Sequence, residues 1–199
     1  MIRATPDSPR MFESNFVDFF SRTHAAVVPI VFLPASAALF WRGVSQAMVP
    51  LSVCVGLFVG GAVTWTLVEY WLHRTFFHWI PAGKWGERMH FLVHGVHHDW
   101  PRDKYRLVMP PAVSVTLFFI FLTIWYLVFG PRLVWAFHAG FVFGYTVYDV
   151  AHYYVHHFTP RTRYGKALRK HHLLHHFKNP ELDYGVSSMV WDYVFRTKS

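Results

Sequence analysis

The stretch that decides the fold class is Leu133-Val-Trp-Ala-Phe-His-Ala-Gly-Phe-Val-Phe-Gly-Tyr-Thr-Val-Tyr-Asp-Val-Ala-His-Tyr-Tyr-Val155, which is followed at once by His156-His157. A helix needs about 20 mostly apolar residues to cross the hydrocarbon core of a bilayer, and this stretch is long enough. It therefore predicts a transmembrane helix that ends in a cluster of histidines.

Three further apolar stretches precede it, approximately Ala25–Trp41, Ala47–Leu72 and Pro111–Gly130. The first is the shortest and contains Pro29 and Pro34, so it is either a kinked span or a re-entrant segment. We expect an all-α, polytopic integral membrane protein with about four transmembrane helices. In this interpretation residues 1–24 form a cytoplasmic amino-terminal segment, and residues 25–199 form one membrane-embedded domain.

The composition supports a membrane protein and excludes a disordered chain. Of the 199 residues, 53% are apolar and only 15% are charged, whereas an average soluble domain has about 25% charged residues. The single cysteine, Cys54, lies in an apolar run and can form no intramolecular disulfide. The outlier is histidine, with 15 residues against 11 Asp and Glu.

The net charge of +8 is explained by the positions of the basic residues. Four spans place residues 1–24, 73–110 and 156–199 on one side, with 3, 6 and 8 Lys or Arg, while the opposite turns contain only Arg42 and Arg132. Loops rich in Lys and Arg stay cytoplasmic, so both termini and the central loop should face the cytoplasm. No basic stripe accompanies a nucleic-acid-binding motif, so we expect no nucleic-acid partner.

Histidine clusters occur at or beyond the predicted cytoplasmic ends of the spans: His73 and His78; His94, His97 and His98; His152, His156 and His157; and His172, His175 and His176, with His171 just before. Spacings of three and four place side chains on one helix face about one turn apart. Such clusters have no role in apolar packing, and uncompensated polar groups near hydrocarbon are costly. They therefore predict metal binding, in a cytoplasmic helical cap that includes helix-like stretches at Trp85–His98 and Arg163–Lys178.

The step of five residues from His73 to His78 does not fit a regular helix, which would place these side chains about 140° apart. Either the helix ends between them, or a π-bulge rotates one of them towards the other. The isolated His24 and His138 belong to no cluster and are expected to be ordinary polar residues.

Two metal ions fit the number of histidines better than one, because one ion takes at most about six ligands. Imidazole suits iron, zinc, copper and nickel alike, so the ligands do not select the metal. An ion pathway would place ionisable residues near the bilayer midplane, whereas these clusters lie at one interface. That position favours chemistry on a lipid over the alternative of a metal transporter or metal-storage protein.

The chain resembles the fatty acid hydroxylase/sterol desaturase superfamily of membrane oxygenases, and is most similar to fatty acid 2-hydroxylases. The resemblance covers about Glu69 to Phe195. It is carried by Glu69-Tyr-Trp-Leu-His-Arg with His78, His90-Phe-Leu-Val-His-Gly-Val-His-His98, Arg106-Leu-Val-Met-Pro-Pro111, Tyr148-Asp-Val-Ala-His-Tyr-Tyr-Val-His156, His172-Leu-Leu-His-His-Phe-Lys-Asn179, Tyr184-Gly-Val-Ser-Ser and Trp191-Asp. The alternative within this superfamily is a sterol or carotenoid oxygenase or a desaturase.

The resemblance implies a dimetal site in which ten histidines are the ligands: His73, His78, His94, His97, His98, His152, His156, His172, His175 and His176. Ligand histidines usually donate their other ring N–H to an acceptor. Glu69 and Asp149 have the spacing to supply such acceptors to His73 and His152. His157 and His90 are expected to support the ligands without binding metal, and His171 to support them or to face solvent.

The resemblance also implies two iron ions, although purified protein could contain zinc, and O2 as the co-substrate for hydroxylation of an acyl C–H bond in a fatty acid or sphingolipid. Some relatives begin with a cytochrome b5 domain, and about 24 residues before the first span leave no room for one. We therefore expect a separate protein to supply electrons. The sequence gives no oligomeric state.

Overall fold

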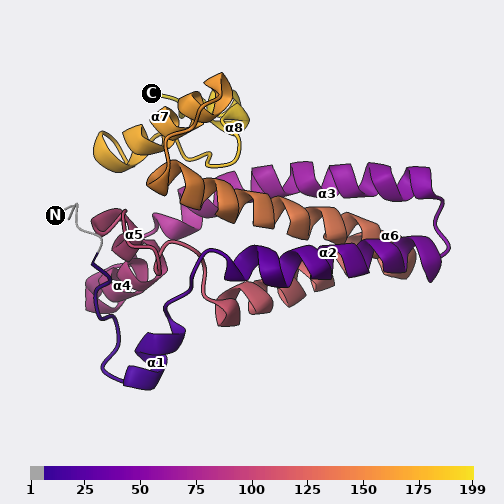
Figure 1. Cartoon of the computed structure of the whole chain (residues 1–199), viewed down its shortest axis with the longest axis horizontal. Coiled ribbons are helices and arrows are strands. Elements are labelled where there is room, and N and C mark those ends of the chain that lie inside the picture. The colour runs from indigo at the N-terminus through magenta and orange to yellow at the C-terminus, as the bar shows by residue number, and fades with distance from the viewer. Residues whose placement is uncertain (1–6) are drawn as a thin grey trace. The chain divides into compact units, whose positions relative to one another are not determined.

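The structure is a computed structural model that describes residues 7–199. It confirms the all-α class, since the described residues contain helices and no strand. The elements (Figure 1) are α1 (Asn15–Phe20), α2 (Val27–Ser45), α3 (Leu51–Trp71), the π-helix η1 (Leu72–Phe77), α4 (Gly83–His90), the π-helix η2 (Phe91–Gly95), α5 (Val96–Asp99), α6 (Pro111–His157), α7 (Arg163–Phe177) and α8 (Val190–Val194).

The chain divides into two compact units. One, which we call the apolar unit, comprises Ala26–Leu67 and Met109–Val150. The other, which we call the histidine unit, comprises the described residues up to Ala25 together with Val68–Val108 and Ala151–Ser199. The prediction of an amino-terminal segment over residues 1–24 and one membrane-embedded domain over residues 25–199 stays a prediction.

Three helical segments of the described chain are long and apolar enough to cross a membrane: Val27–Ser45, Leu51–Phe77 and Pro111–His157. Four apolar stretches were predicted, and three helical segments are found, because two of the stretches are joined in α6. Gly130 has φ 74° and ψ 178° inside α6, and Pro131 follows it. A positive φ is a conformation that glycine adopts without a steric penalty, so α6 consists of two helical segments joined at this bend.

The two segments of α6 fold back against each other within the apolar unit. The ring of Trp125 lies 5.1 Å from that of Phe137, and the ring of Phe121 lies 4.8 Å from that of Phe141, measured between centroids. Four apolar helical segments therefore exist, in agreement with the four predicted stretches. The first, α2, is helical over 19 residues even though Pro34 lies inside it.

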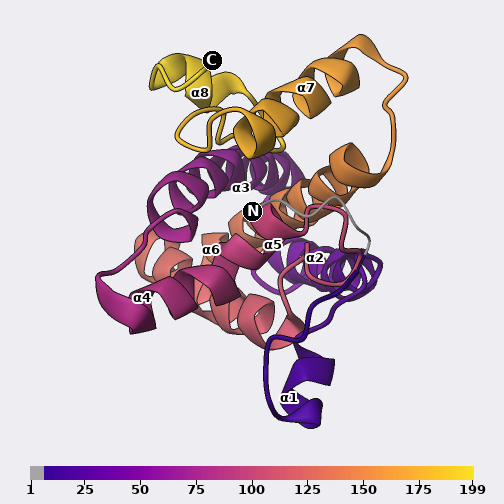
Figure 2. The same cartoon turned by 90° about the vertical axis from the view of Figure 1, so that its left-hand side faces the viewer.

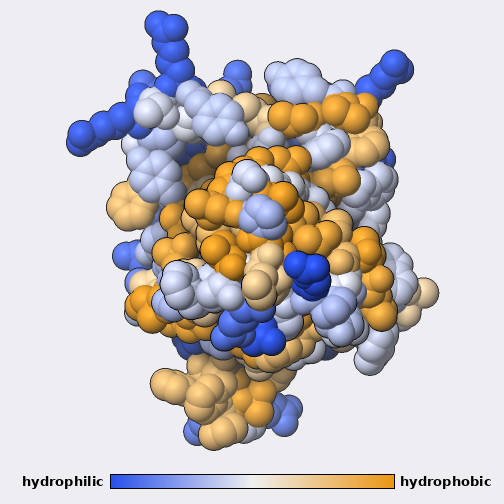
Figure 3. Space-filling view, turned by 90° about the vertical axis from the view of Figure 1, so that its right-hand side faces the viewer, coloured by the Kyte–Doolittle hydropathy of each residue, from blue (hydrophilic) through white to orange (hydrophobic). Residues whose placement is uncertain are grey.

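Small residues let the helices of the apolar unit approach closely, as is common between membrane helices. A Cβ atom on Gly140 would lie 1.8 Å from the carbonyl oxygen of Phe58, and one on Gly61 would lie 2.0 Å from that of Phe137. The hydroxyl of Ser36 donates a 2.8 Å hydrogen bond to the carbonyl of Ala139. Large apolar side chains point outward instead, among them Ile30 at 70% and Leu127 at 79% exposure. Figure 3 shows a face on which hydrophobic residues predominate at the centre.

The histidine unit contains the shorter helices (Figure 2). The predicted helix-like stretch Trp85–His98 is found as the continuous series α4, η2 and α5, and the stretch Arg163–Lys178 as α7. Residues 9–21 are held to the rest of this unit by a buried ion pair, in which Arg106 Nη2 lies 2.8 Å from Asp18 Oδ1. Arg106 also donates hydrogen bonds to the carbonyl of Pro9 and the hydroxyl of Ser21.

Candidate metal centre

The ten histidines predicted as ligands lie in two groups of five, all within the histidine unit. In each group the nitrogen atoms that could bind a metal lie within 4.8 Å of one another. The first histidine group contains His73, His78, His94, His98 and His175, and the second histidine group contains His97, His152, His156, His172 and His176.

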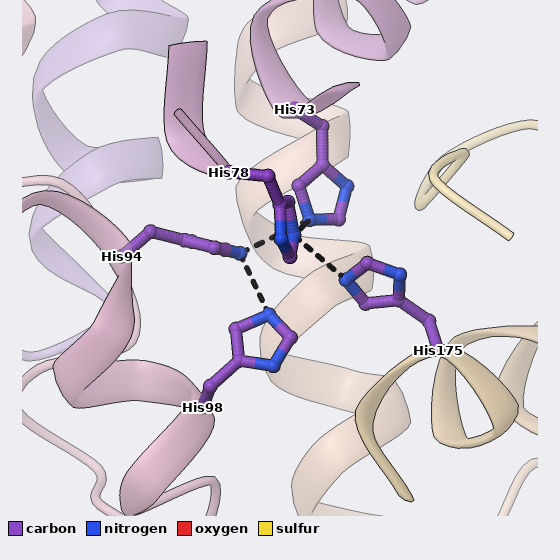
Figure 4. Close-up of side chains that lie close together, drawn as sticks. All are labelled: His73, His78, His94, His98 and His175. Atoms are coloured by element: carbon purple, nitrogen blue, oxygen red, sulfur yellow. Dashed lines mark hydrogen bonds between the residues drawn. The ribbon is translucent and has the colours of Figure 1, made fainter. Parts of the chain in front are cut away.

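In the first histidine group the Nε2 atoms point at a common centre (Figure 4). His94 Nε2 lies 3.0 Å from both His73 Nε2 and His98 Nε2. His78 Nε2 lies 3.1 Å from His175 Nε2 and 3.3 Å from His73 Nε2. Five imidazoles from three segments of the chain, residues 73–78, residues 94–98 and α7, thus converge on one centre.

The π-helix η1 explains how His73 and His78 converge. Because a π-helix closes hydrogen bonds between residues five apart, it brings such residues to the same face. Both sequence-based alternatives for this step are therefore found together, because η1 is a π-helix and it ends at Phe77, just before His78. A regular α-helix would have directed one of these side chains away from the centre.

Each of the two His-x-x-His-His motifs contributes two histidines to one group and one histidine to the other. On η2 and α5, His94 and His98 belong to the first histidine group and His97 to the second. On α7 the order is reversed, because His172 and His176 belong to the second group and His175 to the first. Neighbouring residues on a helix point about 100° apart, so one short motif can serve two centres.

The second histidine group is as tightly assembled as the first. His172 Nε2 lies 2.7 Å from His156 Nε2 and 3.1 Å from His176 Nε2. The ring centroid of His97 lies 4.6 Å from that of His152 and 4.6 Å from that of His176. His97 and His172 are almost completely buried.

Burial keeps these imidazoles neutral at pH 7. It lowers the pKa of His78 to about 3, with a further contribution from the neighbouring His175. Burial likewise lowers the pKa of His98 to about 2 and that of His175 to about 4. For His97 burial again comes first, and it holds the pKa well below the ordinary value. Neutral imidazole is the form that binds a metal ion.

Backbone carbonyls fix the tautomer of two rings in the first histidine group. His73 Nδ1 donates a 2.5 Å hydrogen bond to the carbonyl of Tyr184, and His175 Nδ1 donates a 2.7 Å bond to that of Leu182. A neutral ring carries one N–H, so the Nε2 atoms of both present lone pairs to the centre.

This donor set fits a transition-metal ion. Imidazole nitrogens gathered at one centre are ligands that iron, zinc, copper and nickel all accept. Two nitrogens bound to one ion at about 2.1 Å lie at most about 4.2 Å apart, which is close to the 4.8 Å limit within each group. The two groups could therefore each bind a metal ion.

Glu69 does not have the role predicted for it. It is buried, but it accepts hydrogen bonds from the backbone N–H groups of Val186 and Ser187, both at 2.7 Å, and from the hydroxyl of Ser187. The ring of His73 donates to the Tyr184 carbonyl instead. The spacing placed Glu69 on the correct helix face, but the loop after α7 occupies the space beside the ring.

The other residues expected to support the ligands lie outside both groups. Asp149 is buried in the apolar unit, and its predicted role as the acceptor for His152 stays a prediction. The ring of His157 lies 4.4 Å from that of Tyr153, and His90 Nδ1 lies 3.1 Å from where a Cβ of Gly95 would be. The structure brings neither to a nitrogen of the two groups.

The sequence interpretation underestimated His171, did not name Asp183, and gave Asp192 no role although it is part of the quoted Trp191-Asp string. His171 is buried between them, with Nδ1 3.0 Å from Asp183 Oδ1 and Nε2 2.9 Å from Asp192 Oδ2. The carbonyls of Leu182 and Tyr184 were missed as well. The available signal was the string Tyr184-Gly-Val-Ser-Ser, which belongs to the resemblance but contains no side chain that marks its backbone carbonyls as hydrogen-bond acceptors.

Helices long and apolar enough to cross a membrane thus occur in the same chain as two groups of five histidines that could each hold a metal ion, which defines a class of helical membrane protein with a candidate polyhistidine metal site. The comparisons identify the family. The profile of the fatty acid hydroxylase family matches residues 58–197, and the chain belongs to this family. It is an oxidoreductase of the hydroxylase type.

The chain is similar to named relatives along almost its whole length. A dihydroceramide fatty acyl 2-hydroxylase of Arabidopsis thaliana is 40% identical over 194 residues, which are 98% of this chain and 81% of the relative. A fatty acid 2-hydroxylase of Rattus norvegicus is 36% identical over 94% of this chain and 56% of its own. The solved structure of full-length scs7p, in which only the hydroxylase domain is visible, superimposes with a TM-score of 0.87 at 38% identity and covers 93% of this chain and 70% of that chain.

Proposed function

We propose that this protein hydroxylates position 2 of the acyl chain of a fatty acid or a sphingolipid, using O2 and two iron ions held by the ten histidines. Relatives at 40% and 36% identity are named as 2-hydroxylases of such substrates, which supports the substrate class. The observation that carries the proposal is the division of the ten histidines into two groups of five in a member of the hydroxylase family.

Iron is favoured because the reaction needs a metal that changes oxidation state, and zinc has no redox chemistry. Bound iron supplies the activation of O2 and the oxidation of an unactivated C–H bond. The chain's own part is to hold ligands in place. Burial of the imidazoles keeps bulk water from the centre, and the carbonyls of Leu182 and Tyr184 hold the rings of His175 and His73 in the orientation that aims Nε2 inward.

The site and both termini face the cytoplasm in this proposal, which the distribution of Lys and Arg supports: the apolar unit contains only two such residues, Arg42 and Arg132. The substrate is a membrane lipid. A separate donor protein supplies the two electrons that reduction of O2 requires, and the basic surface of the histidine unit suits an acidic partner.

The decisive experiment compares lipids from cells that produce the wild-type chain, His152→Ala or His138→Ala, with and without isotope-labelled O2. His152 belongs to the second histidine group, whereas His138 lies in the apolar unit and belongs to neither. We expect acyl lipids heavier by one oxygen, derived from O2, in wild-type and His138→Ala cells, and a loss of this product in His152→Ala cells at equal protein abundance.

Two outcomes would contradict the proposal. Undiminished hydroxylation by His152→Ala would show that the second histidine group is not the reactive centre. A product lighter by two hydrogens, with no oxygen added, would show that the enzyme is a desaturase.

A further inference from the structure

The loop that follows α7 carries both carbonyls that orient the first histidine group. We call residues 182–188 the clasp loop. Its Leu182 carbonyl accepts from His175 Nδ1 at 2.7 Å, and its Tyr184 carbonyl accepts from His73 Nδ1 at 2.5 Å. The position of this loop therefore determines where two of the five Nε2 atoms point.

Two buried carboxylates hold the clasp loop by its backbone. Asp192 accepts the N–H of Tyr184 at 2.8 Å through Oδ1 and that of Gly185 at 2.7 Å through Oδ2. Glu69 accepts the N–H groups of Val186 and Ser187. Four consecutive amides of the loop thus end on two carboxylates, and both carboxylates are at most 3% exposed.

The carboxylate of Asp192 has two further partners besides the clasp loop. Its Oδ1 accepts from the hydroxyl of Thr197 at 2.8 Å, and its Oδ2 lies 2.9 Å from His171 Nε2. Each oxygen therefore has two partners, which leaves the carboxylate no freedom to follow the loop if the loop moves.

In the second histidine group the Nδ1 atoms of His97, His172 and His176 have no hydrogen-bond partner among residues 7–199. Both rings that donate to carbonyls of the clasp loop, His73 and His175, belong to the first histidine group. The clasp loop thus acts on one group and leaves the other to the helices that carry it.

We propose that Glu69 and Asp192 are positioning residues for the ion of the first histidine group alone, acting through the clasp loop. The inference rests on the proposed function, since it requires that each group binds an ion. Loss of a hydrogen-bonded partner behind a ligand typically weakens metal binding by about 10- to 100-fold. We therefore expect a lower affinity for one of the two metal ions and an unchanged affinity for the other.

The test uses full-length protein in detergent, loaded with zinc as the probe, and measures both affinities by competition with a chelator. Asp192→Asn cannot accept both amides, because one oxygen becomes an NH2 group. Glu69→Ala removes the acceptor, whereas Glu69→Gln keeps an oxygen for the two amides and an NH2 group for Ser187. We expect Asp192→Asn and Glu69→Ala to bind one zinc ion as tightly as the wild type does and the other about 10- to 100-fold more weakly. Glu69→Gln should bind both zinc ions with wild-type affinity.

The design contains its own controls. The retained zinc reports that the variant is folded, and saturating zinc should return the content to two ions per chain, which a misfolded protein would not do. Asp18→Asn is the matched control, because Asp18 is also a buried carboxylate that accepts a backbone N–H, that of Met11, in the same unit. In a His97→Ala background, Asp192→Asn should weaken the remaining ion, which identifies the affected group as the first.

The outcomes distinguish a failure of this inference from a failure of the proposed function. If the wild type binds two zinc ions and Asp192→Asn and Glu69→Ala leave both affinities unchanged, or weaken both equally, the inference is overturned and the proposed function stands. A folded wild type that binds no zinc overturns the proposed function, and the inference with it.

Discussion

The imidazole rings of His98 and His176 stack on each other, with centroids 4.2 Å apart and an angle of 21° between their planes. These residues belong to different histidine groups. The two groups are therefore in direct contact, and each of the two His-x-x-His-His motifs contributes to both. The ten histidines therefore form one continuous cluster built from shared motifs, although each group has its own five nitrogens.

The first prediction concerns metal content. Protein purified in mild detergent should contain two transition-metal ions per chain, measured by elemental analysis. His97→Ala should lower the content to about one, because it removes one of five ligands of the second histidine group. His24→Ala should leave two, since His24 is exposed and belongs to neither group. A content of one ion in folded wild-type protein would refute the dinuclear arrangement.

The second prediction concerns helix packing in the apolar unit. Gly140→Ala should lower the midpoint of thermal unfolding by several degrees, because its Cβ would lie 1.8 Å from the Phe58 carbonyl oxygen, and such overpacking costs about 1–3 kcal/mol. Gly56→Ala is the matched control. No atom lies within 4 Å of its Cβ position, so the gain in helix propensity, up to about 1 kcal/mol, should leave stability equal or higher. Equal midpoints for the two variants would contradict the packing described.

The third prediction concerns membrane topology. Cysteines introduced at Ala82 and Lys198 should react with impermeant thiol reagents only from the cytoplasmic side. A cysteine at Met48, which is 78% exposed, should react from the opposite side. The native Cys54 is buried and should not contribute to labelling. Labelling of position 82 or 198 from outside intact cells would show that the orientation is inverted.

The fourth prediction concerns acid stability. Burial raises the pKa of Asp18, but hydrogen bonds from the Met11 and Phe12 amides and from Arg22, with the charge of Arg106, outweigh burial and hold that pKa well below its ordinary value. A carboxyl with a lowered folded-state pKa stabilises the fold above its unfolded-state pKa of about 3.9. This stabilisation is lost as the pH falls further, towards the folded-state pKa.

Thermal unfolding between about pH 5 and pH 2 measures this effect. The wild-type midpoint should fall with decreasing pH more steeply than that of Asp18→Asn, which carries no titrating group at this position. Parallel pH profiles for the two proteins would show that Asp18 has an ordinary pKa in the folded state.

The sequence by itself determined the fold class and the helical segments. The apolar stretches predicted the helices, because a helix satisfies its own backbone hydrogen bonds in hydrocarbon and needs about 20 apolar residues to cross it. The bend at Gly130, next to Pro131, joins two of those stretches into α6, as their separation in sequence indicated. The spacing of His73 and His78 even restricted the local geometry to two choices, of which the structure contains the π-helix η1.

Only the tertiary structure decided how the histidines divide and what holds them. Helical periodicity shows which side chains of one helix share a face, but His97 and His98 could not be assigned to different groups without the positions of α7 and η1. The same limit explains Glu69. Its spacing from His73 was correct, yet its partner is a loop more than 100 residues later, at Val186 and Ser187. Contacts between distant segments depend on how the helices pack. That packing cannot be predicted from the local sequence around Glu69.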